Sequence, residues 1–344
     1  MLRWFEKTDE KRPGVISSRI RLVRNWEEYK FPAMLGTQES EEMVRRLEFG
    51  LKDLSEVEGR KYEYAMLEEL EELDRAALRE RRIINRAAVE KKAPAGIILS
   101  EDEDTSILLN GDDHIRLQLL SSGLHLEELW ERADVLDDYI NERFPYAFDD
   151  RYGYLTSFPK NVGTGMRASV VVHLPMLSSG RKFPALIADM SRFGTAVRGV
   201  YGAGEENFGS LYEISNQKTL GQSEKEIADV VTKAAIQLTN QEMTVRKMSL
   251  QRRRLEREDE VYKAYVVLKY ARRLTARDGM IFLSQVMAGA ADGLLAMKEP
   301  CSIYRLMLGL QPANLQKISD RPLSKEELDI ARAEFIRGEL PDLK

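Results

Sequence analysis

Five arginines in four distant segments are the residues of this sequence best suited to chemistry. A guanidinium group keeps its charge at physiological pH, and its planar fork donates paired hydrogen bonds to two oxygens of one phosphate. Several such groups drawn together would bind a single polyanionic ligand. The sequence therefore predicts a phosphate-binding site, called here the arginine cage, made of Arg19, Arg21, Arg116, Arg167 and Arg198.

The segments around these arginines contain recognisable strings in a fixed order. Together they resemble the ATP:guanidino phosphotransferase (phosphagen kinase) family, and within it the bacterial protein-arginine kinases. The resemblance runs over nearly the whole chain. It rests on Ser17–Arg24 followed by Phe31-Pro32, on Asp113–Arg116, on Gly153–Ser157 leading into Asn161–Ser169, and on Ile214–Gln217 followed by Thr219–Gly221.

The resemblance implies transfer of a phosphoryl group from ATP to a guanidinium group. Such a reaction needs cations that hold the phosphates and Mg²⁺ in line, and carboxylates that orient and deprotonate a weak nucleophile. Mg²⁺ would arrive with the nucleotide, so no metal site of the protein's own is expected. The nucleotide-binding residues implied by the resemblance are Ser17, Ser18, Arg19, Ile20, Arg21, Arg116, Arg167, Ala168, Ser169, Val170, Val171, Arg198 and Gly199.

The carboxylates next to the reacting guanidinium are reduced in this chain. Family members read Asn-Glu-Glu-Asp-His where this chain has residues 110–114, so the base becomes Asp112 and its neighbour becomes Gly111. Aspartate is one methylene shorter than glutamate, and a displacement of about 1 Å can cost roughly a hundredfold in rate. His114 is interpreted as a residue that hydrogen-bonds within this loop, and Asp113 as a carboxylate that pairs with an arginine or fixes the loop.

The second orienting glutamate of the family corresponds to Ala203. Glu205 and Glu206 follow in the same glycine-rich loop and are candidates to replace it, although exposed loop carboxylates are the simpler interpretation. Without such a replacement, the sequence predicts weak or lost phosphoryl transfer.

Three further positions depart from the family pattern. The family's reactive cysteine before Pro159 is Phe158, which cannot act as a thiolate. A histidine near the adenine corresponds to Lys92. In the C-terminal region the phosphoarginine pocket of the family uses an Arg-Asp pair, where this chain has Leu328-Asp329, so Asp329 alone remains to bind a guanidinium.

Two functions stay open. The first is an ATP- and Mg²⁺-dependent protein-arginine kinase with Asp112 as the base. The second is a pseudokinase that binds nucleotide and acts as a regulatory or adaptor protein, and Gly111 and Ala203 favour it. A small-molecule phosphagen kinase is disfavoured because it would need the same carboxylates. By resemblance, the partners would be a second copy of the chain, a zinc-finger activator and a chaperone–protease system of the stress response.

The composition limits the remaining classes. The 344 residues suggest two domains, and the net charge of −5 gives no global basic field for nucleic acid or an anionic membrane. Cys301 is the one cysteine and has no partner for an intramolecular disulfide, so we expect the protein to reside in the reducing cytoplasm. The three histidines are too few to suggest a structural metal site. No apolar run approaches the roughly 18 residues of a membrane span.

Hydrophobic spacing predicts an α+β fold, with an antiparallel sheet flanked by helices over residues 1–248 and an all-helical region over residues 249–344. Residues 37–80 are expected to form surface helix. Capping boxes are expected to open helices at Ser223 and Ser324. The other expected elements are strands over 95–100, 106–110, 169–174 and 211–216, and a helix over 126–143.

Overall fold

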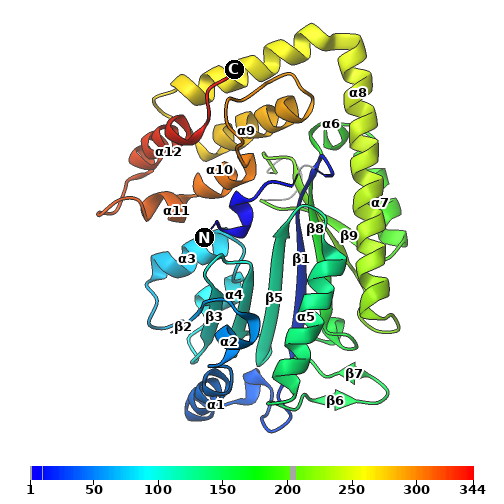
Figure 1. Ribbon diagram of the computed structural model, residues 1–344, viewed down its shortest axis with the longest axis vertical. Coiled ribbons are helices and arrows are strands. Elements are labelled where there is room, and N and C mark those ends of the chain that lie inside the picture. Colours follow the sequence, from blue (N-terminus) through cyan, green and yellow to red (C-terminus); the bar gives the residue numbers. More distant parts are fainter. Residues whose placement is uncertain (1, 10, 202–206) are drawn as a thin grey trace.

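An eight-stranded antiparallel sheet forms the centre of the computed structural model, which describes residues 2–9, 11–201 and 207–344 (Figure 1). The strands β5, β1, β8 and β10 lie side by side in its middle, and they carry most of the arginine cage. The spatial order is β2 (Tyr62–Met66), β3 (Gly96–Ser100), β4 (Thr105–Leu109), β5 (Ile115–Ser122), β1 (Val15–Arg24), β8 (Met166–His173), β10 (Leu211–Asn216) and β9 (Thr195–Gly199).

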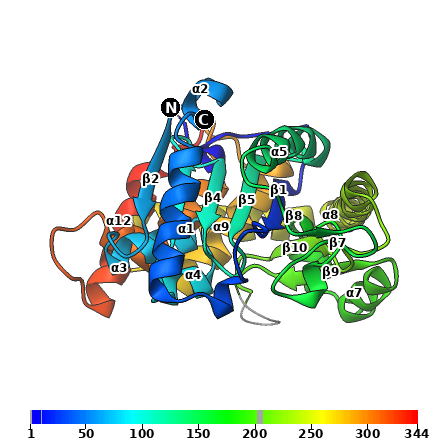
Figure 2. The same ribbon diagram turned by 90° about the horizontal axis from the view of Figure 1, so that it is seen from below.

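One face of the sheet packs on helices that form the larger hydrophobic core, as the end-on view of Figure 2 helps to follow. Their apolar residues meet the inward side chains of the strands, for example Ile20 and Leu22 of β1. The helices on this face are α1 (Thr37–Gly50), α2 (Leu54–Glu58), α5 (Leu126–Asn141), α7 (Phe183–Arg192) and the first part of α8 (Glu224–Tyr270), with the short α6 (Pro175–Ser178) nearby.

A second core lies against the opposite face, toward the end where the C-terminal helices gather (Figure 1). It joins the 3-10 helix η1 (Trp4–Glu6) to the C-terminal region. The other elements here are α3 (Glu72–Glu80), α4 (Arg86–Glu90), α9 (Ala276–Ala291), α10 (Ile303–Gly309), α11 (Pro312–Gln316) and α12 (Lys325–Glu339). The loops also contain η2 (Pro32–Met34), η3 (Pro159–Asn161) and a small β6–β7 pair (Phe148–Asp149 and Gly153–Tyr154).

The predicted α+β fold is confirmed, with the expected strand pair β3–β4 and helices capped by Ser223 and Ser324. The helix expected over residues 37–80 is wrong in part. Tyr62–Met66 forms the edge strand β2 instead, with Tyr64 opposite Ile98 of β3. The open edge of β3 offers a ladder of hydrogen bonds that outweighs the local helical spacing.

The helix α8 crosses the boundary expected at residues 248/249. It begins beside the sheet and ends among the C-terminal helices, and Arg253 interrupts it with φ −141° and ψ 46°. A kink of this kind redirects the helix without a linker. The division into two domains therefore stays a prediction. No helix in the described part of the chain is long and apolar enough to cross a membrane.

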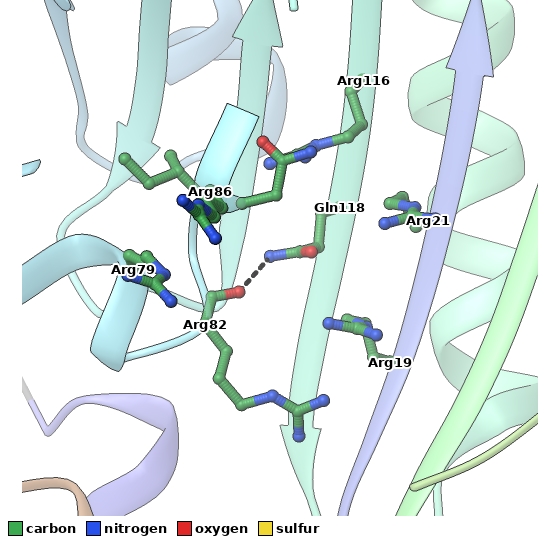
Figure 3. Close-up of a pocket in the computed structure, with 9 residues that line it drawn as sticks. Arg19, Arg21, Arg79, Arg82, Arg86, Arg116 and Gln118 are labelled. Atoms are coloured by element: carbon green, nitrogen blue, oxygen red, sulfur yellow. Dashed lines mark hydrogen bonds between the residues drawn. The ribbon is translucent and has the colours of Figure 1, made fainter. Parts of the chain in front are cut away.

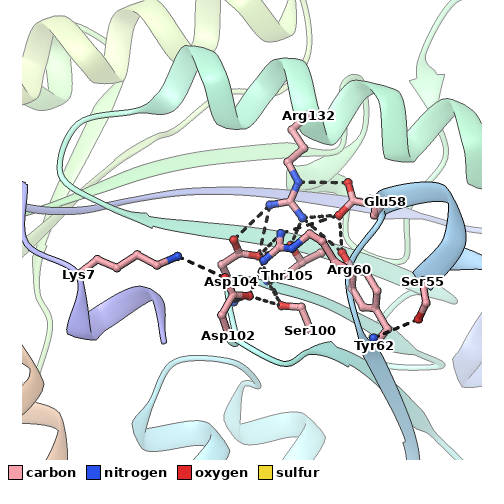
Figure 4. A network of polar contacts seen from close by, with 10 residues as sticks. All are labelled: Lys7, Ser55, Glu58, Arg60, Tyr62, Ser100, Asp102, Asp104, Thr105 and Arg132. Atoms are coloured by element: carbon pink, nitrogen blue, oxygen red, sulfur yellow. Dashed lines mark hydrogen bonds and ion pairs between the residues drawn. The ribbon is translucent and has the colours of Figure 1, made fainter. Parts of the chain in front are cut away.

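The acidic turn between β3 and β4 is partly buried, with Asp102 and Glu103 almost inaccessible to solvent. It takes part in a network of ion pairs (Figure 4). Asp102 and Asp104 both pair with Arg60, which leads into β2. Arg132 of α5 binds Asp104 and Glu58 in the same network, at 3.3 and 2.5 Å. These ion pairs join the edge of the sheet to α5. None of them involves an arginine of the cage.

Candidate functional site

Strand alternation places the cage arginines on one face of the sheet. In β1, Ile20 and Leu22 enter the larger core, so Arg19 and Arg21 point to the other side. The same argument holds for Arg116 of β5 and Arg167 of β8, which alternate with core residues. Arg21 lies directly opposite Arg167 in the β1–β8 pairing. The fold thus brings four predicted cage residues to one surface.

A cavity of about 240 Å³ opens on this surface (Figure 3). Arg19, Arg21 and Arg116 line it, and Gln118 of β5 lies between them. The opposite wall comes from residues 79–86, which run from the end of α3 to the start of α4 and contain no residue predicted for the cage. Its lining residues are Arg79, Arg82, Ile84, Asn85 and Arg86.

The segment 79–86 is held against the sheet by hydrogen bonds to its backbone. Gln118 Nε2 donates to the carbonyl oxygens of Arg82 and Ile83, and Arg116 Nη2 donates to that of Ile83. Arg82 has φ 68°, a left-handed backbone conformation that residues other than glycine rarely adopt. The sharp turn that results leads its guanidinium into the cavity. The density of arginine in this segment was the signal that could have revealed it.

Crowding of like charges is the main electrostatic feature of the cavity. Burial lowers the pKa of Arg21 to about 9, and the positive charges of Arg19 and Arg116 add to the lowering. Burial likewise lowers the pKa of Arg116 to about 10, with Arg19 contributing. Within the described residues, Arg21 makes no side-chain hydrogen bond or ion pair. An anion in the cavity would relieve this repulsion.

Arg167 and Arg198, the two remaining cage residues, do not line the cavity. Arg167 donates to the carbonyl oxygen of Asn216 at 2.9 Å. Arg198 is exposed and lies one residue before the end of β9 (Thr195–Gly199). Arg19 Nε donates to Ser169 Oγ at 3.2 Å.

Several residues expected at the nucleotide point elsewhere. Ile20, Ala168 and Val170 are buried in the larger core, and Val171 is buried in the second core. Ser18 Oγ donates to the carbonyl oxygen of Gly123 at 2.8 Å. These side chains do not line the cavity, and neither do Ser17 and Gly199. Their assignment to nucleotide binding stays a prediction.

The loop that carries Asp112 reaches the rim of the cavity. Asn85, a lining residue, donates through Nδ2 to Asp112 Oδ2 at 3.2 Å. The Asp112 side chain is otherwise exposed. At Gly111, an added Cβ would lie 2.7 Å from Leu108 Cδ2 of the buried core, so a larger residue there requires Leu108 to move. A single carboxylate at the rim is what this loop offers to a guanidinium.

Two family models match the chain. The ATP:guanido phosphotransferase C-terminal catalytic domain matches residues 42–245, and the protein-arginine kinase McsB C-terminal domain matches residues 254–344. The chain belongs to the ATP:guanido phosphotransferase family.

Relatives within the family are named protein-arginine kinase. That of Desulforamulus reducens is 38% identical over 343 residues, which cover 99% of this chain and 96% of the relative. That of Bacillus velezensis is 38% identical over 339 residues, covering 98% and 93%. The chain is therefore a homologue of protein-arginine kinases, as its motifs predict.

Solved structures of phosphagen kinases share the fold. Lombricine kinase superimposes with a TM-score of 0.59 and 25% identity, over 71% of this chain and 69% of that chain. A duplicated taurocyamine kinase from Schistosoma mansoni, solved with bound transition state analog components, gives 0.61 at 23% identity. It is covered over 38% of its length, and this chain over 77%.

Other positions that differ from the ATP:guanido phosphotransferase pattern lie outside the cavity. Phe158 is 44% exposed, with Lys160 Nζ 5.3 Å from its ring centre. Lys92 is exposed and does not line the cavity. Ala203, Glu205 and Glu206 lie outside the described residues, so their place relative to the cage stays a prediction.

Asp329, the expected guanidinium ligand of the C-terminal region, is buried and already paired. Its Oδ1 accepts from Arg332 at 2.7 Å, and its Oδ2 lies 3.5 Å from Arg273 Nε. Arg332 also donates to the carbonyl oxygens of Leu274 and Leu310. A ligand guanidinium would have to displace these contacts. In the described part of the chain, no group of three or more His, Cys, Asp and Glu side chains is arranged to hold a metal.

His114 holds the Asp112 loop to the segment after β1. Its Nδ1 accepts from the backbone N–H of Trp26 at 3.0 Å, and its Nε2 donates to the carbonyl oxygen of Lys30 at 2.9 Å. Burial lowers its pKa to about 4, and the charge of Lys91 contributes. The partners of the imidazole thus lie in the segment after β1, whereas the backbone carbonyl oxygen of His114 accepts from the Asn110 N–H within the loop at 2.7 Å. Asp113 accepts from Asn25 and from the Ser157 N–H, which confirms it as a loop-fixing carboxylate.

We expect His114 to make stability depend on pH. Its folded pKa of about 4 is below the unfolded value of 6.5, so the unfolded chain takes up the proton first. The stabilisation is complete above pH 6.5 and falls by up to about 3 kcal/mol as the pH falls toward 4. Glutamine offers the same acceptor and donor, so His114→Gln should flatten this slope in urea unfolding between pH 4 and 7.

His173 provides the matched control. Burial lowers its pKa to about 3, and it is bonded to Ser284. His173→Gln should remove the contribution of His173 to the pH dependence of the unfolding free energy and leave the contribution of His114 unchanged. An unchanged slope in His114→Gln would contradict the buried, neutral imidazole.

Proposed function

We propose that the chain binds Mg·ATP through the arginine cage, with Arg82 as an additional member. The observation that carries this proposal is the cavity at which Arg21 and Arg116 meet without a carboxylate partner of their own among the described residues. Three phosphate groups, which stay net negative with Mg²⁺ bound, would supply the negative charge that this surface lacks. Membership of the ATP:guanido phosphotransferase family supports the same ligand.

We infer further that phosphoryl transfer to protein arginine is weak or lost. The support is chemical: Asp112 is a shortened base at the rim of the cavity, and Ala203 stands where the family has a carboxylate. Electrostatic partners of the transition state typically contribute 10²–10³ in rate. The alternative function, a pseudokinase acting as a regulator or adaptor, follows if transfer is absent. The zinc-finger activator, the chaperone–protease system and the cytoplasmic location stay predictions.

We propose that the C-terminal region forms a homodimer. After the kink at Arg253, α8 exposes Leu255, Tyr262, Val266 and Tyr270 at steps of seven, four and four residues. This spacing places them on one side of the helix. Their exposed fractions are 79, 46, 49 and 70%. A second copy of the same face would cover this apolar stripe, in accord with the dimer that the resemblance implies.

The first prediction concerns nucleotide binding. Mg·ADP should raise the melting temperature, since a ligand that binds only the folded state stabilises it by mass action, by about 2.7 kcal/mol at a hundred times Kd. Arg21→Ala or Arg167→Ala should remove most of the shift, measured by scanning fluorimetry and calorimetry. Arg192→Ala, an exposed arginine on α7, should keep it. No shift at saturating nucleotide would contradict the cage.

The second prediction concerns the missing carboxylates. The unmodified chain should form very little acid-labile phosphoarginine on an arginine-rich acceptor with Mg·ATP. Asp112→Glu combined with Ala203→Glu should gain more than either single change, because groups that act as a unit are not additive. Gly111 is left unchanged because a Cβ added there would lie too close to Leu108.

Robust activity of the unmodified chain, abolished by Asp112→Asn, would instead establish a working protein-arginine kinase. Equal activity of all four proteins at the background level would show that carboxylate loss is not the cause.

The third prediction concerns the α8 face. Light scattering should find a dimer at micromolar concentration, and Tyr262→Glu with Val266→Asp should give a folded monomer, because two charges cannot be buried unpaired in the interface. Val135→Asp, on an exposed apolar residue of α5, should stay dimeric. A monomeric unmodified chain would overturn the proposal.

A further inference from the structure

A carboxylate already lies within the arginine cage. Glu213 of β10 accepts hydrogen bonds from Arg19 Nη2 with both of its oxygens, at 3.1 and 3.0 Å. Arg82 Nη2 donates to Oε2 of the same carboxylate, one of the two oxygens that Arg19 bonds. Both arginines line the cavity, and they belong to segments 63 residues apart in the sequence. Glu213 therefore joins the two walls of the cavity through its charge.

The surroundings keep this carboxylate ionised. The side chain of Glu213 is 22% exposed, and those of Arg19 and Arg82 are each 14% exposed. Burial alone would raise the pKa of Glu213, but the charges of Arg19 and Arg82 bring it to about 2. Glu213 also faces Arg198 in the β10–β9 pairing, and its charge is felt by Arg167. The Glu213 carboxylate is thus surrounded by arginines from several strands and from the opposite wall.

The contacts of Glu213 have the form that a phosphate group would take. A carboxylate presents two coplanar anionic oxygens, and arginine binds carboxylate and phosphate with the same fork. We propose that Glu213 is an internal ligand of the arginine cage, which competes with an incoming phosphate group for Arg19 and Arg82. This inference rests on the proposed function only in requiring that the cavity accepts phosphate.

The competition divides the cage into two sets. Arg21 and Arg116 have no carboxylate partner of their own among the described residues, so they are open to the first anionic group that enters. Arg19 and Arg82 become available only when their hydrogen bonds to Glu213 are given up. A ligand with two linked phosphates can reach both sets, whereas a small single anion can be held by the first alone.

The exchange is confined to side chains because the backbone around Arg82 is fixed. Gln118 binds its carbonyl oxygen at 3.0 Å. Two residues earlier, Glu80 accepts from the backbone N–H groups of Ala313 and Asn314 at the start of α11, both at 2.9 Å. The guanidinium of Arg82 can therefore rotate from Glu213 to a phosphate without moving the segment.

Calorimetric titration with pyrophosphate tests the inference, since pyrophosphate fills the cage without adenosine or metal. Glu213→Gln keeps the shape of the side chain and removes its charge. We expect it to bind pyrophosphate about tenfold more tightly than the unmodified chain. Glu41→Gln, which removes an exposed carboxylate paired with Arg45 on α1 and away from the cavity, is the matched control and should change affinity less than about twofold. Equal or weaker binding by Glu213→Gln would overturn the inference.

Two additions keep the result interpretable. If Glu213→Gln does not fold, Glu213→Asp withdraws the charge by one methylene and should bind between the unmodified chain and the tenfold gain; no gain would overturn the inference. Mg·ADP is titrated in parallel. Tighter pyrophosphate binding with no Mg·ADP binding by any variant would reject the proposed nucleotide site and leave the role of Glu213 supported.

Discussion

Repulsion among buried arginines is the constraint on which the rest of this site depends. Successive side chains of a strand point to opposite faces of the sheet. Because Ile20 and Leu22 enter the core, Arg19 and Arg21 must share the other face. Neighbouring strands repeat the arrangement, so cations meet where solvent screens them poorly. Burial of the apolar core on the other face offsets the electrostatic cost of bringing these arginines together. An anion, whether Glu213 or a ligand, is what the surface requires.

The cavity also depends on contacts between the sheet and the C-terminal helices. The segment 79–86 supplies one wall, and Glu80 fixes its start by accepting the free N–H groups of α11. Arg81 binds both Glu103 of the acidic turn and Asn314 of α11. The wall is therefore anchored at the sheet edge and at the helical region together. A shift of α11 would therefore act on this wall through Glu80 and Arg81.

The two halves of the expected chemistry differ in how completely they are built. The phosphate side has more arginines than the motifs indicated, since Arg79, Arg82 and Arg86 join the cavity. The guanidinium side has Asp112 at its rim, bonded to Asn85. If the site binds phosphates strongly and the guanidinium poorly, as we propose, it would hold nucleotide rather than transfer the phosphoryl group rapidly. This difference is the physical basis for keeping the pseudokinase function as the alternative.

The sequence by itself determined the family, the α+β class, the paired strands β3–β4 and the capped helices, because motifs, residue periodicity and capping boxes are local signals. It also identified Arg19, Arg21 and Arg116 through strings that the family shares. Tertiary structure decided the rest. Tyr62–Met66 became a strand because a sheet edge was available, and Asp329 became a paired, buried carboxylate. Arg82 and Glu213 meet only in the fold, since 131 residues separate them and no local pattern relates two charges that far apart.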